Sequence, residues 1–259
     1  MIRVLVSGAA GRMGSAVVTA VLGAEDLSLV AAVDPAHEGQ PLAEGVDFTI
    51  SGDLAGAIEA TSPDVMVDFT HPSAVAGNIA TALDRGVHCV VGTTGIDPRM
   101  LASLAETAPE GTCLFVAPNF ALGAVLMMRF AAEAARYLPH VEIIELHHDK
   151  KADAPSGTAL RTAALIAETR ESVPHAPGRE TEVADGARGA LVENVTIHSV
   201  RLPGLVAHQE VLFGGQGQTL AIRHDSIDRT SFMPGVLLGI RGVIGRNGLV
   251  VGLEQLMDG

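Results

Sequence analysis

The sequence predicts an α/β protein with a doubly wound parallel sheet, followed by a second α+β domain built on a mostly antiparallel sheet. Short apolar runs rich in β-branched residues alternate with helix-like segments through the first 120 residues. These runs lack polar alternation, which is typical of strands covered on both faces. Beyond residue 140 the pattern changes to longer strand-like runs, two of which flank a glycine-rich turn.

The first part of the chain alternates strands and helices regularly. We expect strands at 2–7, 27–34, 65–70, 88–94 and 113–119, and helices at 13–23, 72–86, 97–108 and 121–138. The second part is predicted as a strand at 141–148, a helix at about 158–170, and strands at 195–202, 207–214 and 218–225. The last 30 residues return to helix and strand. The chain is therefore expected to complete its first domain at the end.

Composition and charge narrow the possible partners. The formal net charge is −13 and no basic stripe interleaved with aromatic residues is present, so nucleic acid is not expected to bind. The best membrane-span candidate is interrupted by Arg129 and Glu133, so no membrane association is expected. Cys89 and Cys113 lie in separate apolar runs and are interpreted as buried, reduced thiols. With no signal peptide expected at the start, these features predict a cytoplasmic protein.

A glycine-rich loop follows the first strand, in the stretch GAAGRMG. Gly8, Gly11 and Gly14 permit a tight turn, close approach to a pyrophosphate and tight helix packing, and the helix N-terminus offers N–H donors. Asp34 ends the second strand 20 residues after Gly14, where it could bind ribose hydroxyls. The order of strand, loop, helix and acid predicts a Rossmann-like dinucleotide site. The alternative is an ordinary strand-to-helix turn with a capping aspartate.

The surroundings of Asp34 favour NADH over NADPH. No lysine or arginine lies between Arg12 and Arg85, so a 2′-phosphate would meet Asp34 with only His37 nearby. NADPH stays possible because Arg12 can offset part of the repulsion. Three further strand ends are expected to line the same crevice, because ligands bind outside the carboxyl ends of parallel strands. They are Phe69 and Thr70, the GTTG stretch at 92–95 and the APNF stretch at 117–120.

The segment HHDKKADAPSGTA at 147–159 contains the only two lysines of the chain, Lys150 and Lys151. A partly desolvated lysine can donate a proton and then remain neutral, which arginine cannot. Ser156, Gly157 and Thr158 open a helix and can hold an anion. The segment thus suits an anionic substrate that must be protonated. A solvated basic loop is one alternative, and a zinc site is disfavoured because adjacent histidines on a strand alternate faces, so we expect no metal.

Together, ELHHDKKADAPSGTA, GAAGRMG, DFTHP, GTTG and APNF resemble the dihydrodipicolinate (4-hydroxy-tetrahydrodipicolinate) reductase family of bacterial lysine biosynthesis, over essentially the whole chain. The resemblance implies reduction of a cyclic unsaturated dicarboxylate with NADH or NADPH, and a homotetramer formed through the second domain. It assigns acid/base roles to His147 and Lys151, and carboxylate binding to His148, Gly157 and Thr158. The cofactor contacts that it implies, with the strand ends above, are Gly8, Ala9, Ala10, Gly11, Arg12, Met13, Asp34, Phe69, Gly92, Thr93, Thr94, Ala117, Pro118, Asn119 and Phe120.

Pro35 departs from relatives that favour NADPH, which usually carry arginine at this position. We expect a dinucleotide-binding domain at 1–119 plus about 230–259, and a substrate-binding and oligomerisation domain at 120–229. Two alternatives remain open. One is another two-domain nicotinamide dehydrogenase that acts on an amino acid or aldehyde, and the other is a non-catalytic redox sensor that binds NADH.

Overall fold

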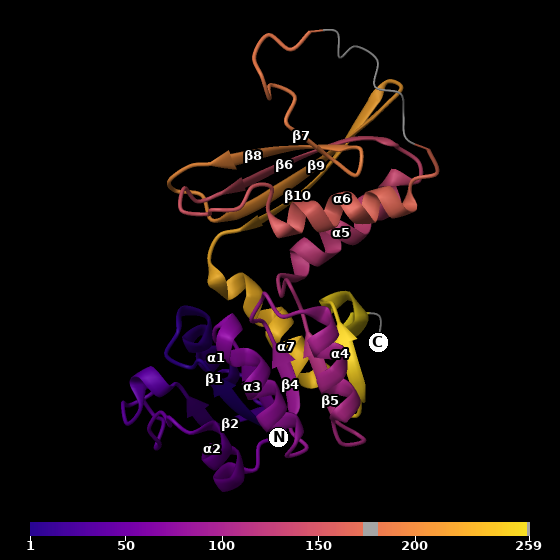
Figure 1. The fold of residues 1–259 in the computed structure, drawn as a ribbon. Helices are drawn as coiled ribbons and strands as arrows, with labels where there is room; N and C mark the ends of the chain where they lie inside the picture. Colours follow the sequence, from indigo (N-terminus) through magenta and orange to yellow (C-terminus); the bar gives the residue numbers. More distant parts are fainter. Residues whose placement is uncertain (173–180, 258–259) are drawn as a thin grey trace. The chain divides into compact units, whose positions relative to one another are not determined.

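The computed structural model describes residues 1–172 and 181–257, which fold into two compact units (Figure 1). Unit 1 contains Met1–Phe120 and Phe232–Gly259, and unit 2 contains Ala121–Ser231. The chain therefore passes between the units twice.

Unit 1 is built on a six-stranded sheet in the order β11-β5-β4-β3-β1-β2, and every neighbouring pair is parallel. The chain runs from β1 outward to β2 and then returns to β3 on the other side of β1. This reversal creates a switch point between the carboxyl ends of β1 and β3, where ligands bind in open parallel sheets. The strands are β1 (Ile2–Ser7), β2 (Leu27–Val33), β3 (Val65–Asp68), β4 (His88–Val91), β5 (Cys113–Val116) and β11 (Gly248–Val251).

Helices cover both faces of this sheet. Buried side chains of α2, α3 and α4 form one core cluster with residues such as Leu5 and Met66. On the opposite face α7 lies close to Val90 and Phe115, and a Cβ added at Gly239 would be 3.0 Å from the Phe115 ring. α1 packs beside α7. The helices are α1 (Arg12–Leu22), α2 (Leu54–Thr61), α3 (Pro72–Leu83), α4 (Pro98–Thr107) and α7 (Met233–Gly242), with 3-10 turns η1 (Pro35–His37), η2 (Arg229–Phe232) and η3 (Leu253–Leu256).

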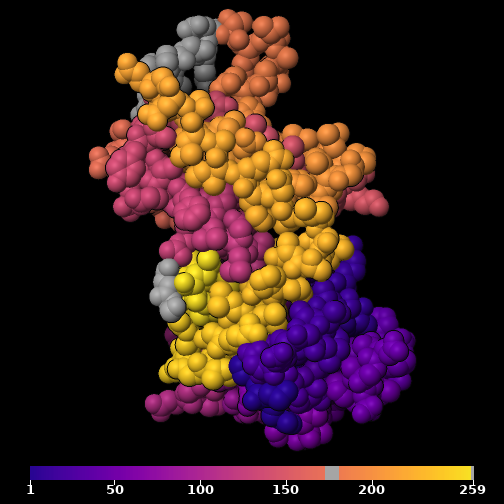
Figure 2. All heavy atoms as spheres, turned by 180° about the vertical axis from the view of Figure 1, so that it is seen from behind, coloured from indigo at the N-terminus to yellow at the C-terminus, as the bar shows by residue number. Residues whose placement is uncertain are grey.

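The two ends of the chain meet within unit 1. Figure 2 shows the yellow C-terminal segment lying against the indigo N-terminal segment on one surface. Arg241 of α7 forms a bidentate ion pair with Asp26, which precedes β2. Its Nε and Nη2 lie 2.7 and 2.8 Å from the two carboxylate oxygens. β11 adds the last strand beside β5. The C-terminal segment is thus an integral part of the parallel-sheet unit.

Unit 2 contains a five-stranded mixed sheet in the order β10-β9-β6-β8-β7, with α5 and α6 on one face (Figure 1). Ile143, Ile197, Val211 and Phe213 are fully buried in the core of this unit. The elements are α5 (Leu122–Ala135), β6 (His140–His147), α6 (Gly157–Thr169), β7 (Ala190–Val192), β8 (Val195–Arg201), β9 (Ala207–Gly215) and β10 (Gln218–Ser226).

The pairing in unit 2 is mostly antiparallel. β9 pairs antiparallel with β6 and β10, and β7 pairs antiparallel with β8, whereas β6 and β8 are parallel. The parallel pair is possible because α6 lies between these two strands in the chain. The glycine-rich stretch is the hairpin turn between β9 and β10, with Gly217 at φ +70°. The predicted fold class is therefore confirmed.

Two elements were not anticipated. α2 follows Asp53 in a short alanine-rich stretch, and its Asp53 side chain makes no capping hydrogen bond. β7 is only three residues long and pairs with β8 alone. Elements of eight and three residues span too little of a helix or strand period to give a clear pattern, which explains their absence from the prediction. Within the described residues, no helix combines the length and apolar character needed to cross a bilayer.

Candidate active site

The glycine loop after β1 is tightly packed against two neighbouring segments. Gly8 has φ +79°, and a Cβ there would lie 2.6 Å from the carbonyl oxygen of Phe69. A Cβ at Gly14 would lie 2.0 Å from the carbonyl oxygen of Gly8. The loop therefore passes directly between the end of β3 and the first turn of α1. Because the first N–H groups of a helix lack intrahelical acceptors, this cradle fits a dinucleotide pyrophosphate.

Asp34 lies directly beside this loop. Its carboxylate accepts hydrogen bonds from the N–H groups of Ala10 and Ala36, both at 3.2 Å, and contacts His37 Nδ1 at 3.1 Å. The side chain remains 14% exposed. Asp34 thus holds the loop and the turn after β2 together while part of its carboxylate remains open to a ligand, as ribose binding requires.

A buried carboxylate organises the ends of β3 and β4. Asp68 is fully buried and accepts hydrogen bonds from the Thr70 N–H at 3.1 Å and the Thr70 hydroxyl at 2.8 Å. It also accepts from the Thr93 hydroxyl and the Asn78 amide, each at 2.8 Å. The hydroxyl of Thr93, which we predicted as a cofactor contact, is therefore engaged in holding the two strand ends together. Asp68 was not among the predicted site residues, although a charged residue at the end of a buried apolar run was an available signal.

Aromatic rings form an apolar wall at the same edge. Phe69 and Phe120 lie 5.7 Å apart between ring centroids, and Phe120 packs edge-on against Phe115 at 5.9 Å. A Cβ at Gly92 would lie 2.0 Å from the Phe69 ring, so glycine is needed for this packing. Phe115 and Phe120 are buried and Phe69 is half-buried, so the cluster supports the strand ends and only the Phe69 ring is partly accessible to a ligand.

The predicted cofactor residues are gathered at one edge of the parallel sheet. They follow the carboxyl ends of five strands, beginning with β1 and β3 at the switch point (Figure 1). Exposure differs among them: Arg12, Thr94 and Pro118 are exposed, whereas Ala9, Ala117 and Phe120 are buried. The buried residues among them can contact a cofactor only through backbone atoms, or can support the neighbours that contact it.

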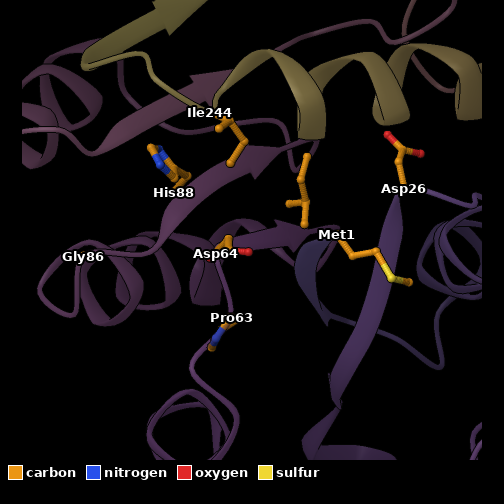
Figure 3. Close-up of a pocket in the computed structure, with 8 residues that line it drawn as sticks. Met1, Asp26, Pro63, Asp64, Gly86, His88 and Ile244 are labelled. Carbon is orange, nitrogen blue, oxygen red and sulfur yellow. The ribbon is translucent and has the colours of Figure 1, made fainter.

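A pocket lies at the opposite edge of the same sheet, beside the amino ends of its strands (Figure 3). Its lining includes Met1, Asp64 and His88, which precede or begin β1, β3 and β4. His88 Nδ1 accepts a hydrogen bond from the Cys113 N–H at 3.0 Å, so this imidazole has a structural role. Because ligands of open parallel sheets bind at carboxyl ends, this amino-end pocket is not the expected cofactor site.

Within unit 2, the basic motif begins at the end of β6. His147 is the last residue of the strand, with its side chain 14% exposed, and His148 follows it as an exposed residue. The ammonium group of Lys151 is held by both carboxylate oxygens of Asp153, at 2.7 and 2.8 Å. Lys150 is exposed. The two lysines therefore occupy different environments.

Ser156 forms the N-cap of α6. Its hydroxyl oxygen accepts the Ala159 N–H at 3.2 Å, and the residue is 2% exposed. Gly157 is exposed and Thr158 is half-buried. The helix entry is therefore rigid on its inner side and accessible at Gly157, which is compatible with an anion-binding site.

Glu145, for which no role was predicted, contacts the His147 ring from the same strand. Its carboxylate contacts His147 Nδ1 at 2.5 Å, accepts two hydrogen bonds from Arg201 at 2.8 and 2.9 Å, and accepts the Ser156 N–H at 3.2 Å. Burial acts to raise the pKa of Glu145, but hydrogen bonds from Arg201, Ser199 and His147 outweigh it and lower that pKa. Burial also lowers the pKa of His147, against the opposing effect of Glu145. Strand alternation places Glu145 and His147 on one face, which was the available signal.

Two other histidines of unit 2 have structural partners. His198 Nε2 lies 2.8 Å from Glu142, and His208 Nδ1 lies 2.7 Å from Asp225. His208 Nε2 also accepts the Val206 N–H at 3.2 Å. These interactions explain the positions of both rings without a catalytic role.

Comparison with known proteins identifies the family. The model for the N-terminal part of dihydrodipicolinate reductase matches residues 2–120, and the model for its C-terminal part matches residues 123–257. The chain belongs to the dihydrodipicolinate reductase family. A 4-hydroxy-tetrahydrodipicolinate reductase of Nocardia farcinica is 53% identical over 261 residues, covering 99% of both chains. The corresponding enzyme of Listeria monocytogenes is 52% identical over 264 residues, covering 99% of this chain and 100% of the relative.

Solved structures agree with this assignment. A dipicolinate-bound dihydrodipicolinate reductase from Paenisporosarcina sp. TG-14 has a TM-score of 0.88 and 45% identity, with 99% of this chain and 100% of that chain covered. An amine dehydrogenase from Mycobacterium smegmatis has a TM-score of 0.67 at 18% identity, covers 96% of this chain and 94% of that chain, and therefore shows the fold alone. The predicted family and the prediction of a nicotinamide-dependent oxidoreductase are confirmed.

Proposed function

We propose that this family member reduces 4-hydroxy-2,3,4,5-tetrahydrodipicolinate to 2,3,4,5-tetrahydrodipicolinate with NAD(P)H in lysine and diaminopimelate biosynthesis. The overall reaction consumes the substrate, one NAD(P)H and one proton, and it yields the product, NAD(P)⁺ and water. The observation that carries the proposal is the motif at the end of β6 and the start of α6, where His147 and the helix-cap residue Ser156 both contact Glu145 and Lys151 lies in the loop between them. Full-length similarity to curated reductases supports it.

The residues of unit 1 are proposed to bind and orient the nucleotide. The Gly8–Gly14 cradle receives the pyrophosphate, and Asp34 accepts the ribose hydroxyls. When bound, the cofactor supplies the hydride. Phe69, supported by the buried Phe120 ring, and the strand ends at 92–94 and 117–120 complete the proposed site and exclude water.

The residues of unit 2 are proposed to bind the dicarboxylate and supply the proton. His148, Ser156, Gly157 and Thr158 hold the carboxylates, with the start of α6 as an anion site. Either Lys151 or His147 delivers the proton that completes reduction. Positive charge at this site also stabilises the electron-rich intermediate. The proposed domains, 1–119 with about 230–259 and 120–229, divide these two roles between the two parts of the chain.

We further propose that NADH is the preferred cofactor, that the protein is a homotetramer and that it acts in the cytoplasm. NADH is favoured because Asp34 would face a 2′-phosphate and the following residue is Pro35. The tetramer is proposed to form through the exposed face of the unit 2 sheet. Neither nucleic acid nor a membrane is part of the proposed function.

A coupled assay tests the activity and the nucleotide preference together. The substrate is generated by a dihydrodipicolinate synthase from pyruvate and aspartate semialdehyde, and loss of reduced-nucleotide absorbance is followed with NADH and with NADPH. We expect turnover with the cyclic substrate, none with aspartate semialdehyde alone, and a higher kcat/KM for NADH. Turnover with aspartate semialdehyde alone would indicate a different dehydrogenase. Nucleotide binding without turnover of the dicarboxylate would indicate a redox sensor.

A further inference from the structure

Glu145 is a fully buried carboxylate that the proposed reaction has not yet used. It lies two residues before His147 on β6, on the face that packs against α6. A buried carboxylate is costly unless it is paired and hydrogen-bonded. Glu145 meets this requirement through Arg201 of β8, which is the register partner of His147 across the parallel pair.

The arrangement determines which nitrogen of His147 can exchange a proton. Nδ1 of the ring lies 2.5 Å from Oε2 of Glu145, and an ionised carboxylate can only accept a hydrogen bond. Nδ1 therefore carries a proton in both charge states of the ring, and Nε2 is left for exchange with a ligand. The carboxylate also stabilises the imidazolium form.

We propose that Glu145, held in place by Arg201, is a positioning residue that fixes the tautomer and orientation of His147 for proton transfer through Nε2. The inference rests on the proposed function, because it assigns His147 a role in that reaction. Arg201 compensates the negative charge of Glu145, so the pair remains neutral overall while the imidazole gains or loses its proton.

The same carboxylate connects the proton carrier to the substrate-binding loop. Oε1 of Glu145 accepts the N–H of Ser156, the N-cap of α6, at 3.2 Å. Arg201 also donates to the carbonyl oxygen of Asp153 at 2.7 Å. Glu145 and Arg201 thereby hold both ends of the loop that carries Lys151. Loss of Glu145 should consequently affect kcat and the KM for the dicarboxylate, but not the KM for NADH.

Charged groups around His147 determine the direction of the pH effect. Glu145 acts to raise the pKa of His147, whereas Lys151 and Arg201 act to lower it. Asp153 faces the cluster through its ion pair with Lys151. Removing the negative charge of Glu145 therefore lowers the pKa of His147 further. If imidazolium is the proton donor, the alkaline decline of kcat moves to lower pH.

The first measurement uses the wild-type protein without substrate. Nitrogen-15 NMR of histidine-labelled protein, with His147→Gln for assignment, reports which ring nitrogen carries the proton in the neutral form. We expect Nδ1–H. A neutral ring protonated at Nε2 would overturn the inference, and this result is independent of whether the proposed substrate is reduced.

The second measurement compares Glu145→Gln, Glu145→Asp and the control Glu142→Gln. Glu142 is matched because it lies on the same strand and also contacts a histidine and an arginine, His198 and Arg188, on the opposite face. We expect Glu145→Gln to lower kcat by about tenfold or more and to shift its pH profile, because positioned acid–base groups contribute about 10²–10⁴-fold. Glu145→Asp should retain part of the wild-type profile, and Glu142→Gln should retain all of it.

These variants distinguish a positioning role of Glu145 from a role in protein stability alone. An unchanged pH profile and tautomer in Glu145→Gln would overturn the proposal. If that variant does not fold because Arg201 loses its partner, Glu145→Asp decides the matter, since it keeps the charge but shortens the reach to Nδ1. A wild-type profile and kcat in Glu145→Asp would then count against the proposal.

Discussion

The two lysines of the chain differ in their surroundings, and this difference is the basis for the different roles proposed for them. Lys151 is 22% exposed and its ammonium group contacts both oxygens of Asp153. Lys150 is exposed. An ammonium group held at a defined position beside a proposed dicarboxylate site can deliver a proton, whereas a solvated one contributes mainly long-range charge.

Lys151→Ala is expected to reduce kcat by about 100-fold or more, because it removes a proposed proton donor and a carboxylate-binding charge. NADH affinity should change little, since the residues proposed to bind the nucleotide lie in unit 1. Steady-state kinetics and NADH fluorescence titration measure the two effects separately. Lys150→Ala is the matched control and should retain kcat within a few-fold. Similar turnover in both variants would show that Lys151 has no part in proton transfer.

A different histidine affects stability instead of chemistry. Burial lowers the pKa of His88 below its ordinary value of 6.5, with partial opposition from Asp64. Its Nδ1 accepts the Cys113 N–H, an interaction that protonation of that nitrogen abolishes. Below pH 6.5 the unfolded chain binds more protons than the folded chain, so acidification favours unfolding. The contribution of His88 is fully present above pH 6.5 and is lost as the pH falls toward its lower folded-state pKa.

His88→Asn should reduce the pH dependence of stability, because its side-chain oxygen can accept a hydrogen bond without titrating. Denaturant unfolding at about pH 7.5 and about pH 5 measures the free energy of unfolding in each condition. The difference between the two conditions should be smaller in the variant than in the wild type. His140→Asn, at an exposed position, is the control, and the stability difference between the two pH values should stay as in the wild type. An equal difference in His88→Asn and wild type would contradict the assignment.

Among the elements, the β1 loop and α1 depend on a contact between backbones. The helix begins immediately after the loop, and Gly14 faces Gly8 with no room for a side chain. This packing brings the first turn of α1 toward the loop that is proposed to receive the pyrophosphate. The same physical requirement recurs where Gly92 faces the Phe69 ring. Small residues at these positions therefore determine how closely the strand ends approach one another.

Gly14→Ala is expected to destabilise the protein by about 1–3 kcal/mol, because overpacking forces the backbone apart. NADH binding should weaken as well, since the loop must move. Gly77→Ala is the matched control: this glycine lies inside α3 with nothing near an added Cβ. It should stabilise the helix by about 0.5–1 kcal/mol and leave binding intact. Thermal unfolding and NADH titration test both variants, and equal effects would refute the packing argument.

At the scale of the whole molecule, the proposed cofactor and substrate residues belong to different units, and the chain passes between these units twice. Among the described residues of unit 2, helices cover one face of the sheet. Its other face carries the half-buried residues Ile144, Leu146 and Leu212 among charged side chains such as Glu142 and Arg223. A sheet face that combines partly buried apolar residues with ion pairs can form an interface between subunits.

The homotetramer is tested by sedimentation equilibrium or light scattering. We expect a mass four times that of the 26.7 kDa chain. Ile144→Arg on the exposed sheet face should shift the protein toward smaller species, because it introduces like charges across a symmetric interface. A monomeric wild-type protein at micromolar concentration would refute the tetramer.

Local patterns in the sequence were sufficient for the fold class, most element positions, the glycine loop and the basic motif. Uninterrupted apolar runs indicate buried parallel strands, and the only two lysines stand beside a helix-start signal, so these features depend on neighbouring residues alone. Only the tertiary structure decided which distant groups support the glycine loop and the basic motif. Asp34 bonds to a loop N–H 24 residues away, and Glu145 meets an arginine 56 residues away, because strand order and register bring distant segments together. Such pairings depend on the burial of the whole sheet, which no local pattern records.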